Sequence, residues 1–429
     1  MTPRAALLSN GRYRVILSGA GTGASLFDDL ALTRWSRDRT RDAEGVLLYI
    51  QDLDRGLAWS AGTSPMRGAP DGGGGEAGRG RARVWRHDGD VSTRLDVCVD
   101  PGADRELRVL TLYNHAVTPR RVAVTSYVEV ALNHPAADAG HPAFSKLFVQ
   151  TEQVPGAEAL LARRRPRSPS ERPVYLGHGL QLAGATRPPR AEWETDRARF
   201  IGRGRGVQHP AALEPGARLS GTTGNVLDPV LALRRHVTIP AGGSVRLVAL
   251  LAAGHDREAV LGGLVLGPEG VDLVFAAAAA RAAEALHAAG LTEAWRQQLP
   301  HLTGELCYGG VVPEPGAALP APSPLLVADL RALGLSGRHP LVLARVSTDA
   351  DRLGAIGLAR VVNYWRAIGV PVDYLVLLDE VRELNLPTAR GQGSVTLLRH
   401  AVEVPADLHR LAARTACHTM GQARAATPA

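Results

Sequence analysis

Cysteine is scarce in this chain of 429 residues. Only Cys98, Cys307 and Cys417 are present, and they lie far apart in the sequence. They show no C-x-x-C spacing, and an odd number of cysteines is a poor basis for a disulfide framework. We therefore expect a reducing compartment and no cysteine-bound metal.

Long hydrophobic runs are also missing. A membrane-spanning helix needs about 18 consecutive apolar residues, but the best candidate, residues 271–289, is interrupted by Asp272, Arg281 and Glu284. The first residues, MTPRAALLSNGRY, lack the apolar segment of a signal peptide. We expect no membrane segment in this chain and a cytoplasmic location.

Lysine is almost absent. The formal net charge is +7, yet the cations are nearly all arginines, and Lys146 is the only lysine. Charges of both signs are mixed along the chain, so the arginine bias reflects genomic base composition better than a nucleic-acid surface. The one dense basic run, residues 163–167, lies in a Pro/Ser-rich loop without interleaved aromatic residues. We therefore expect no nucleic-acid partner.

Glycine and proline, in contrast, are abundant, with 47 and 29 residues. Segments with strand-like alternation recur with turn signals between them and no helices. These predicted strands are residues 13–17, 45–50, 57–60, 82–85, 91–99, 106–113, 121–132, 147–151, 160–163, 178–183, 234–239 and 244–252. The pattern predicts a mainly β fold, a large antiparallel β-sandwich over residues 1–265, with a flexible loop at 66–80.

Helical patterns begin after Asp256. Apolar residues at helical spacing predict a helix over residues 271–289. Thr292 can cap a second helix, which Pro300 is expected to end. Together with a segment that holds five prolines, at 313–324, these residues form a predicted helical linker over 266–324.

The last part of the chain has a third pattern. A buried strand at 341–346, an amphipathic helix at 349–368 and a second strand at 372–378 follow one another directly. Strand, helix and strand in this order predict a right-handed βαβ unit with parallel strands. A further strand near 394–398 and a helix near 406–417 complete a small α/β module, which we assign to residues 325–420.

The glycine-rich turn at residues 19–24 has two interpretations. Gly19, Gly21 and Ala24 follow a strand and match the G-x-G-x-x-G/A pattern of dinucleotide-binding turns. Asp42 lies near the offset of a ribose-binding acid, but inside a charged stretch instead of at a strand end. A hairpin follows, where a nucleotide-binding unit needs a helix. We favour a bend of the sandwich, and a nucleotide-dependent enzyme that uses Gly19–Ala24 is the weaker alternative.

Other candidate chemistry is sparse. His134, Asp138 and His141 cluster in one loop, but two histidines and one carboxylate are weak evidence for a metal site. The adjacent carboxylates Asp28-Asp29 and Asp379-Glu380 point to opposite faces when they lie in a strand, so they cannot bracket one bond. We therefore expect no metal and no cofactor.

Aromatic residues make up only 4% of the chain, but four tryptophans lie in the predicted sandwich, at positions 35, 59, 85 and 193. Most should pack in the core or at its rim. Sugar-binding proteins place aromatic faces against pyranose rings and arginine or aspartate against hydroxyls. Trp35, flanked by Arg34 and Arg37, is the best candidate for such a contact.

The order of several longer motifs gives a family resemblance. They are N-G-R-Y-x-V at 10–15, G-x-G-x-S at 21–25, D-L-A-L-T-R-W at 29–35, T-R-D at 40–42, L-x-Y-I-x-D-L and W-S-A-G within 47–62, V-T-S-Y-V-E-V at 124–130, H-P-A-F-S-K-L-F-V-Q-T-E at 141–152, E-T-D-R-A-R-F-I-G-R-G-R at 194–205 and L-S-G-T-T-G-N-V-L-D-P at 219–229. This resembles the β-supersandwich region of glycoside hydrolase family 94, formerly glycosyltransferase family 36, and most closely that of cyclic β-1,2-glucan synthases. One departure is Ala24, where the family usually has an aromatic residue.

The resemblance implies a role in glucan metabolism. Family members are inverting phosphorylases, and their general acid and phosphate-binding residues lie in an (α/α)6 barrel after the supersandwich. By this resemblance the barrel would begin where the given sequence ends, and we expect no residue here to correspond to the general acid.

We therefore expect a non-catalytic accessory region that packs on such a barrel, or on a second subunit, and helps to shape a site for β-glucan or glucooligosaccharides. Association with the inner membrane would come only through a parent synthase. A free-standing carbohydrate-binding protein is the alternative. The residues expected to contact sugar are Arg34, Trp35, Arg41 and Asp42.

Overall fold

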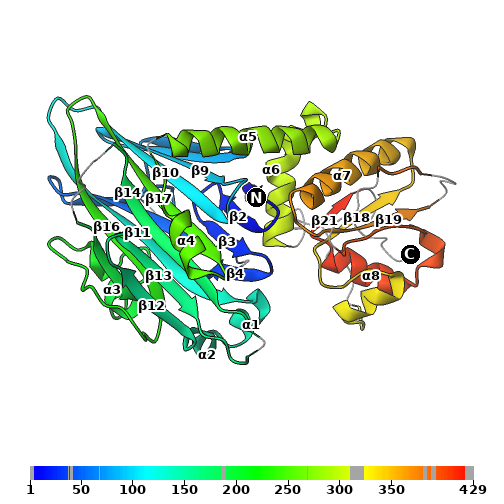
Figure 1. The fold of residues 1–429 in the computed structure, drawn as a ribbon. Coiled ribbons are helices and arrows are strands. Elements are labelled where there is room, and N and C mark those ends of the chain that lie inside the picture. The colour runs from blue at the N-terminus through cyan, green and yellow to red at the C-terminus, as the bar shows by residue number, and fades with distance from the viewer. Residues whose placement is uncertain are drawn as a thin grey trace. The chain divides into compact units, whose positions relative to one another are not determined.

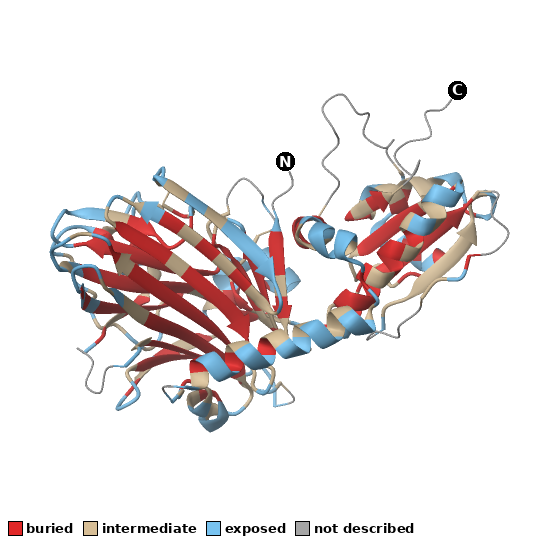
Figure 2. Ribbon diagram, turned by 90° about the horizontal axis from the view of Figure 1, so that it is seen from above, coloured by how far each residue is buried: buried red, intermediate tan, exposed pale blue. Residues whose placement is uncertain are grey.

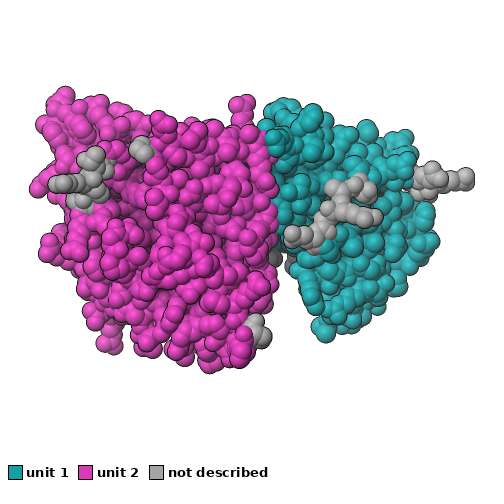
Figure 3. All heavy atoms as spheres, in the orientation of Figure 1, with its two compact units in different colours: residues 1–5, 282–429 teal, residues 6–281 magenta. Residues whose placement is uncertain are grey.

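In a computed structural model, the described residues form two compact units (Figure 3). The described residues are 4–36, 38, 42–66, 68–169, 171–184, 190–267, 269–309, 323–379, 384–387 and 393–420. One unit comprises Ala6–Arg281, and the other comprises Met1–Ala5 with Ala282–Ala429. The described helices include none that is long and apolar enough to cross a membrane.

The larger unit contains two extensive β-sheets within its described residues (Figure 1). The first, with nine strands, consists of β1 (Ala5–Ser9), β2 (Tyr13–Ser18), β3 (Gly23–Phe27), β4 (Leu30–Thr33), β5 (Val46–Asp52), β6 (Leu57–Ser60), β11 (Arg120–Asn133), β15 (Glu192–Asp196) and β16 (Pro229–Ile239). The second, with eight, consists of β7 (Gly72–Gly78), β8 (Arg81–Asp88), β9 (Val91–Val99), β10 (Arg105–Asn114), β12 (Val149–Val154), β13 (Ala159–Arg164), β14 (Val174–Leu182) and β17 (Ser244–Gly254). Neighbouring pairs such as β11–β16 and β10–β17 are antiparallel, which confirms the predicted supersandwich.

The main hydrophobic core lies between these two sheets. Alternate residues of each strand point inward, so Leu48 and Ile50 of β5 pack in one core with Leu95 and Val97 of β9. Each of these side chains is at most 3% exposed. Complete burial of an aliphatic side chain stabilises a fold by about 1.5–3 kcal/mol, so this core is the main source of stability for the larger unit.

The outer faces of both sheets are covered as well, as the extent of buried strand in Figure 2 shows. Helices α4 (Arg257–Gly263) and α5 (Gly270–Ala288) bring Val260, Val271 and Val274 onto the eight-stranded sheet. On the nine-stranded sheet, α3 (Arg197–Ile201) and the 3-10 turn η1 (Ala211–Leu213) belong to another cluster, in which the rings of Phe200 and Tyr127 are 4.6 Å apart.

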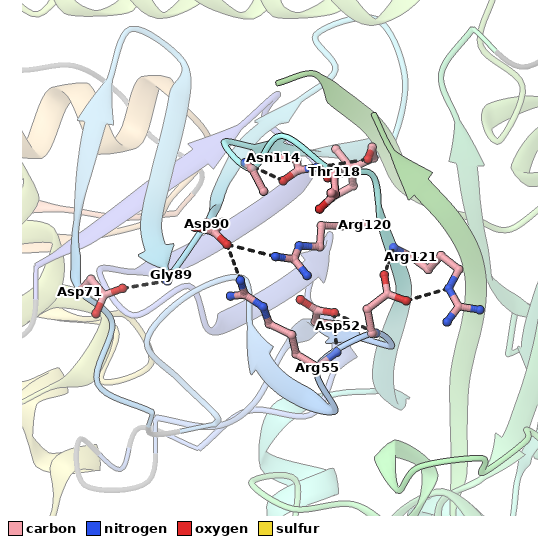
Figure 4. Close-up of polar contacts among 12 residues, drawn as sticks. Asp52, Arg55, Asp71, Gly89, Asp90, Asn114, Thr118, Arg120 and Arg121 are labelled. Carbon is pink, nitrogen blue, oxygen red and sulfur yellow. Dashed lines mark hydrogen bonds and ion pairs between the residues drawn. The ribbon is translucent and has the colours of Figure 1, made fainter. Parts of the chain in front are cut away.

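Ion pairs join the turns of the two sheets at the end where β11 begins (Figure 4). Asp90, in the turn between β8 and β9, accepts hydrogen bonds from Arg55 and from Arg120, the latter at 3.1 Å. Arg121 donates to Asp54 at 2.8 Å through both its backbone amide and its Nε. These contacts stabilise the end of the sandwich at which these turns lie. The helices α1 (Pro135–Gly140) and α2 (Pro142–Lys146) follow β11 at its other end.

The smaller unit holds a four-stranded parallel sheet within its described residues, in the order β20-β19-β18-β21. Its elements are α6 (Glu293–Tyr308), η2 (Val327–Leu333), β18 (Leu341–Val346), α7 (Asp349–Ala367), β19 (Asp373–Leu378), β20 (Thr396–His400), η3 (Ala401–Glu403), α8 (Ala406–Thr415) and β21 (His418–Met420). The predicted βαβ unit is confirmed. Thr348 and Asp351 form a reciprocal capping box at the start of α7, which explains where that helix begins.

Two predictions about local structure are wrong. Residues 72–78, expected in a flexible loop, form strand β7 against β8. Glycine is required there because a Cβ on Gly74 would lie 2.6 Å from the Trp85 ring. Pro300 does not end its helix, since α6 continues to Tyr308 and buries residues 302–308. That packing offsets the roughly 3 kcal/mol that an interior proline costs. Most of the predicted proline-rich segment, residues 313–322, lies outside the described residues.

Candidate functional site

Arg34 occupies the end of β4, where that strand meets β11. Its backbone amide donates to the carbonyl oxygen of Glu129 at 3.0 Å. Its guanidinium makes two parallel hydrogen bonds to Asp138 of α1, both 3.0 Å long. The side chains are only 16% and 10% exposed. Burial acts to lower the pKa of Arg34, but the hydrogen bond and charge of Asp138 raise it more. Arg34 is therefore a fixed cation.

Glu129, on β11, holds a second cation beside this pair. Arg197, the first residue of α3, donates from Nε to Glu129 Oε1 at 2.7 Å, and the Tyr127 hydroxyl donates to the same oxygen at 2.7 Å. Burial acts to raise the pKa of Glu129, but Arg197 and the two hydrogen bonds lower it overall. Glu129 is thus held as a carboxylate and is unsuited to act as a general acid.

The sole lysine of the chain completes the arrangement. Lys146 Nζ, at the end of α2, lies 2.5 Å from Asp228 Oδ1. The other oxygen of Asp228 is 3.9 Å from Arg197 Nε, and its backbone carbonyl accepts from the Arg197 amide at 2.9 Å. We call the three cations and three anions, Arg34, Lys146, Arg197, Glu129, Asp138 and Asp228, the charge network.

The charge network gathers residues from motifs that are far apart in the sequence. Segments 29–35, 124–130, 141–152, 194–205 and 219–229 each contribute to it directly. Asp138, in α1, lies just before the third of them in the sequence. Sequence reasoning selected Arg34 but missed the partners, because nothing local shows which carboxylate faces which cation across 104 residues.

An exposed apolar surface adjoins the charge network. Phe144, Leu147 and Leu227 are 56%, 49% and 80% exposed. Residues 224–228 run beside the start of β12, because Gln150 donates to Asn225 at 2.8 Å and Lys146 pairs with Asp228. Phe144 and Leu147 therefore flank Lys146 in the sequence, and Leu227 precedes its partner Asp228.

The basic run 163–167 belongs to the same face. The guanidinium carbons of Arg164 and Arg167 lie 5.2 and 5.8 Å from the centroid of the Phe148 ring, and Arg165 donates to the Leu147 carbonyl at 3.3 Å. The run thus has an aromatic partner in space that the sequence did not reveal. We call Phe144, Leu147, Phe148, Arg163, Arg165, Arg167 and Leu227 the aromatic–basic surface.

The other predicted sugar contacts lie in different settings. Trp35 directly follows Arg34 and is half-buried. Arg41 lies outside the described residues. Asp42 contacts the hydroxyls of Ser18, at 3.2 Å, and Thr22. Asp42 therefore supports the glycine-rich turn, whereas Arg34 belongs to the charge network.

The glycine-rich turn is a β-hairpin, and the nucleotide-binding interpretation of Gly19–Ala24 is wrong. Leu17 pairs with Gly23 across the antiparallel strands β2 and β3, so no helix follows the turn to receive a pyrophosphate. The glycines instead permit close backbone packing. A Cβ on Gly62 would lie 1.9 Å from the Ala20 carbonyl oxygen, and one on Gly21 would lie 3.0 Å from Gly62 Cα.

The loop with His134, Asp138 and His141 does not assemble a metal site. Asp138 is engaged by Arg34, and His134 Nδ1 lies 3.4 Å from Asp29 Oδ2. Among the described residues, no group of three histidine, cysteine or acidic side chains is placed to hold a metal ion.

Two stacked antiparallel sheets with covered outer faces define a β-supersandwich. The family described as "Glycosyl hydrolase 94, supersandwich domain" matches residues 1–263, and the chain belongs to this family. Membership associates the protein with carbohydrate metabolism.

One curated relative extends the match beyond the supersandwich. Cyclic beta-(1,2)-glucan synthase NdvB of Rhizobium meliloti (strain 1021) is 32% identical over 374 residues, which cover 86% of this chain and 13% of that protein. The chain thus spans about an eighth of the length of this relative.

Solved structures with weak similarity to this chain include a bacterial glucoamylase complexed with acarbose and a putative kojibiose phosphorylase from the human microbiome. The first is 8% identical with a TM-score of 0.40, and the match covers 71% of this chain and 40% of that one. The second is 6% identical with a TM-score of 0.34, and covers 63% of this chain and 32% of that one. Scores this low carry no argument about function.

Proposed function

We propose that this chain is a non-catalytic accessory part of a cyclic β-1,2-glucan synthase or glucan phosphorylase-type enzyme. It packs against a helical catalytic barrel, or a second subunit, and helps to shape a carbohydrate site. The observation that carries the proposal is the convergence of the family motifs on a charge network bordered by an exposed apolar surface.

The charge network suits a structural role better than a chemical one. Cleavage of a glycosidic bond needs a carboxyl group that stays protonated and can reach the leaving oxygen. Each carboxylate of the network instead faces a cation within 3.0 Å. Burial does raise the pKa of Asp104, elsewhere in the unit, but Arg12 lies 3.0 Å from that carboxylate.

The aromatic–basic surface has the composition of a docking site. Protein interfaces are anchored by aromatic and arginine side chains with aliphatic neighbours. Phe144 and Leu147 sit on and next to α2, whose last residue is fixed by the Lys146–Asp228 pair. The network therefore gives the exposed side chains a rigid base, which lowers the entropy that docking would otherwise lose.

The proposal is tested by reconstitution with a separately produced catalytic barrel domain. The chain alone should release no sugar phosphate from β-1,2-glucooligosaccharides and phosphate, but should increase the turnover of the barrel domain. Leu147→Glu should remove that increase. Val117→Glu is the matched control, because Val117 is 94% exposed at the opposite end of β11.

Two outcomes would count against the accessory role. Release of sugar phosphate by the chain alone would show that it is catalytic. Calorimetric binding of β-1,2-glucooligosaccharides that is lost in Trp35→Ala, with no effect on the barrel domain, would favour the alternative of a free-standing carbohydrate-binding protein.

A further inference from the structure

The smaller unit contains a pocket that the proposed function does not use. It has a volume of about 430 Å³ and is lined by Arg331, Ser336, Arg338, His339 and Gly393. These residues lie at the amino ends of the parallel strands, since His339 precedes β18 and Gly393 precedes β20. The volume is within the range of small-molecule sites.

The buried carboxylate of Asp373, at the start of β19, organises the loop that forms the pocket. Its Oδ2 accepts hydrogen bonds from the Ser336 amide at 3.1 Å and from the Ser336 hydroxyl at 2.7 Å. The Ser336 hydroxyl oxygen in turn accepts from the amides of Arg338 and His339. The backbone of the loop at residues 336–339 is therefore held in place by Asp373 and Ser336.

His339 is oriented by the same carboxylate. Its Nδ1 lies 3.4 Å from Asp373 Oδ1. A carboxylate only accepts hydrogen bonds, so Nδ1 is the donor, and Nε2 is the ring nitrogen left to a ligand. Asp373 Oδ1 also accepts from the Val395 amide at 3.1 Å. Asp373 is thus fully engaged behind the pocket, and its side chain is 2% exposed.

The lining of the pocket is strongly cationic. Arg331 and Arg338 are exposed, and none of the five lining residues is acidic. Next to Gly393, the buried hydroxyl of Ser394 has no hydrogen-bond partner within the described part of the chain. Two guanidiniums and an oriented imidazole match the oxygens of a phosphate group.

At the opposite edge of the sheet, where parallel sheets usually bind ligands, several described donors are already engaged by carboxylates. Asp351 accepts the amides of Ser347 and Thr348 at the start of α7, at 3.2 and 2.9 Å. Arg345 is taken by Asp379, with N–O distances of 2.8–3.0 Å. Arg345 and these two amides are therefore already used by carboxylates, and Glu380 lies outside the described residues.

We propose that the pocket at Arg331, Arg338 and His339 binds the phosphate group of a small molecule. The inference is independent of the accessory role, because it concerns the other unit of the chain. Free phosphate and a phosphorylated sugar share the chemistry that the pocket recognises.

Calorimetry on the full chain tests the site with inorganic phosphate, a hexose 6-phosphate and unmodified hexose. Both phosphate-bearing probes should bind, and the hexose should not. If the hexose 6-phosphate binds more tightly than inorganic phosphate, the ligand of the pocket is a phosphorylated sugar. Arg331→Gln with Arg338→Gln should weaken binding by at least about tenfold, because charge-assisted hydrogen bonds are lost.

Arg352→Gln is the matched control, since this α7 arginine is 41% exposed and pairs with Asp349. It should leave the affinity unchanged, and the imidazole NMR signal of His339 should shift with phosphate in the wild type. Absence of binding, equal losses in both variants, or no change at His339 would overturn the proposal.

Discussion

Arg34 and Asp138 form the most enclosed ion pair of the charge network. Ala substitution of either residue leaves its partner largely buried and without this ion pair, which should reduce the free energy of unfolding by about 1–3 kcal/mol. The double substitution should be less harmful than the sum, and chemical denaturation of the four proteins in a mutant cycle measures the difference.

The pair Arg121–Asp54 is the matched control for that cycle. Its bond length is similar, 2.8 Å, but the arginine is 70% exposed, so its coupling should be far weaker. If the two mutant cycles gave equal coupling free energies, the Arg34–Asp138 pair would stabilise the fold no more than an exposed pair, and the charge network would add no particular rigidity.

His178 offers a test of the core at a single position. Its side chain is fully buried between the sheets, with Nδ1 donating to the Leu250 carbonyl and Nε2 2.7 Å from the Ser126 hydroxyl. Burial, with a smaller effect of Arg108, lowers its pKa from 6.5 to about 4 despite the Leu250 bond. The unfolded chain therefore takes up this proton first as the pH falls.

The contribution of His178 to the free energy of unfolding is fully present above pH 6.5 and is lost as the pH falls to about 4. A shift of this size corresponds to roughly 3 kcal/mol. The free energy of unfolding, measured across this range, should fall more steeply for the wild type than for His178→Gln. Parallel curves would mean that His178 has the same pKa in the folded and the unfolded chain.

Prediction of individual site residues from sequence has a clear physical limit. Arg34 and Trp35 stand in a distinctive motif and could be selected. Asp138 and Lys146 could not, because an ion pair depends on the packing of separate elements. Asp42, in the T-R-D motif at 40–42, was expected to contact sugar, but its carboxylate faces the hydroxyls of Ser18 and Thr22.

At the scale of elements, the glycine-rich hairpin makes the sharpest prediction. Gly62→Ala places a methyl group 1.9 Å from the Ala20 carbonyl oxygen. Backbone atoms must move to accept it, so we expect a loss of at least about 2 kcal/mol. Thermal unfolding of the variant, compared with the wild type, measures this loss.

Gly262→Ala is the control, because its Cβ would meet no atom within 4 Å. An exposed alanine in helix α4 should be neutral or stabilising by up to about 1 kcal/mol. If Gly62→Ala were equally harmless, the turn would not be a close-packed bend.

Sequence patterns predicted elements well where local signals and packing agree. Strand β9 has the same limits as its prediction, Val91–Val99, and α7, Asp349–Ala367, begins at the predicted residue. Sequence patterns gave wrong predictions where tertiary contacts override local composition. Four consecutive glycines in β7 suggested a loop, yet β8 and Trp85 hold them in a strand.

At the scale of the whole molecule, helix α5 affects where the C-terminal boundary of the supersandwich domain should be placed. Sequence placed the boundary at residue 265, but Val271, Val274 and Ala278 share a core with Leu107 and Leu250. We propose a boundary after α5. A fragment 1–265 should be less stable than 1–290 by roughly 3 kcal/mol or more, from two lost valine contacts.

Thermal unfolding and gel filtration of the two fragments distinguish the boundaries. The shorter fragment should unfold at lower temperature and aggregate, because the outer face of its eight-stranded sheet is uncovered. Equal behaviour would support the boundary at 265.

The most direct test of the accessory role uses the only lysine of the chain. Reductive methylation with ¹³C-formaldehyde labels Lys146 and the N-terminal amine, so the surface beside the charge network reports through a single side-chain NMR signal. Adding the catalytic barrel domain should shift this signal and slow its labelling severalfold. Leu147→Glu should abolish both effects, and Val117→Glu should not. A complex that forms without any change at Lys146, or no complex at all, would contradict the account.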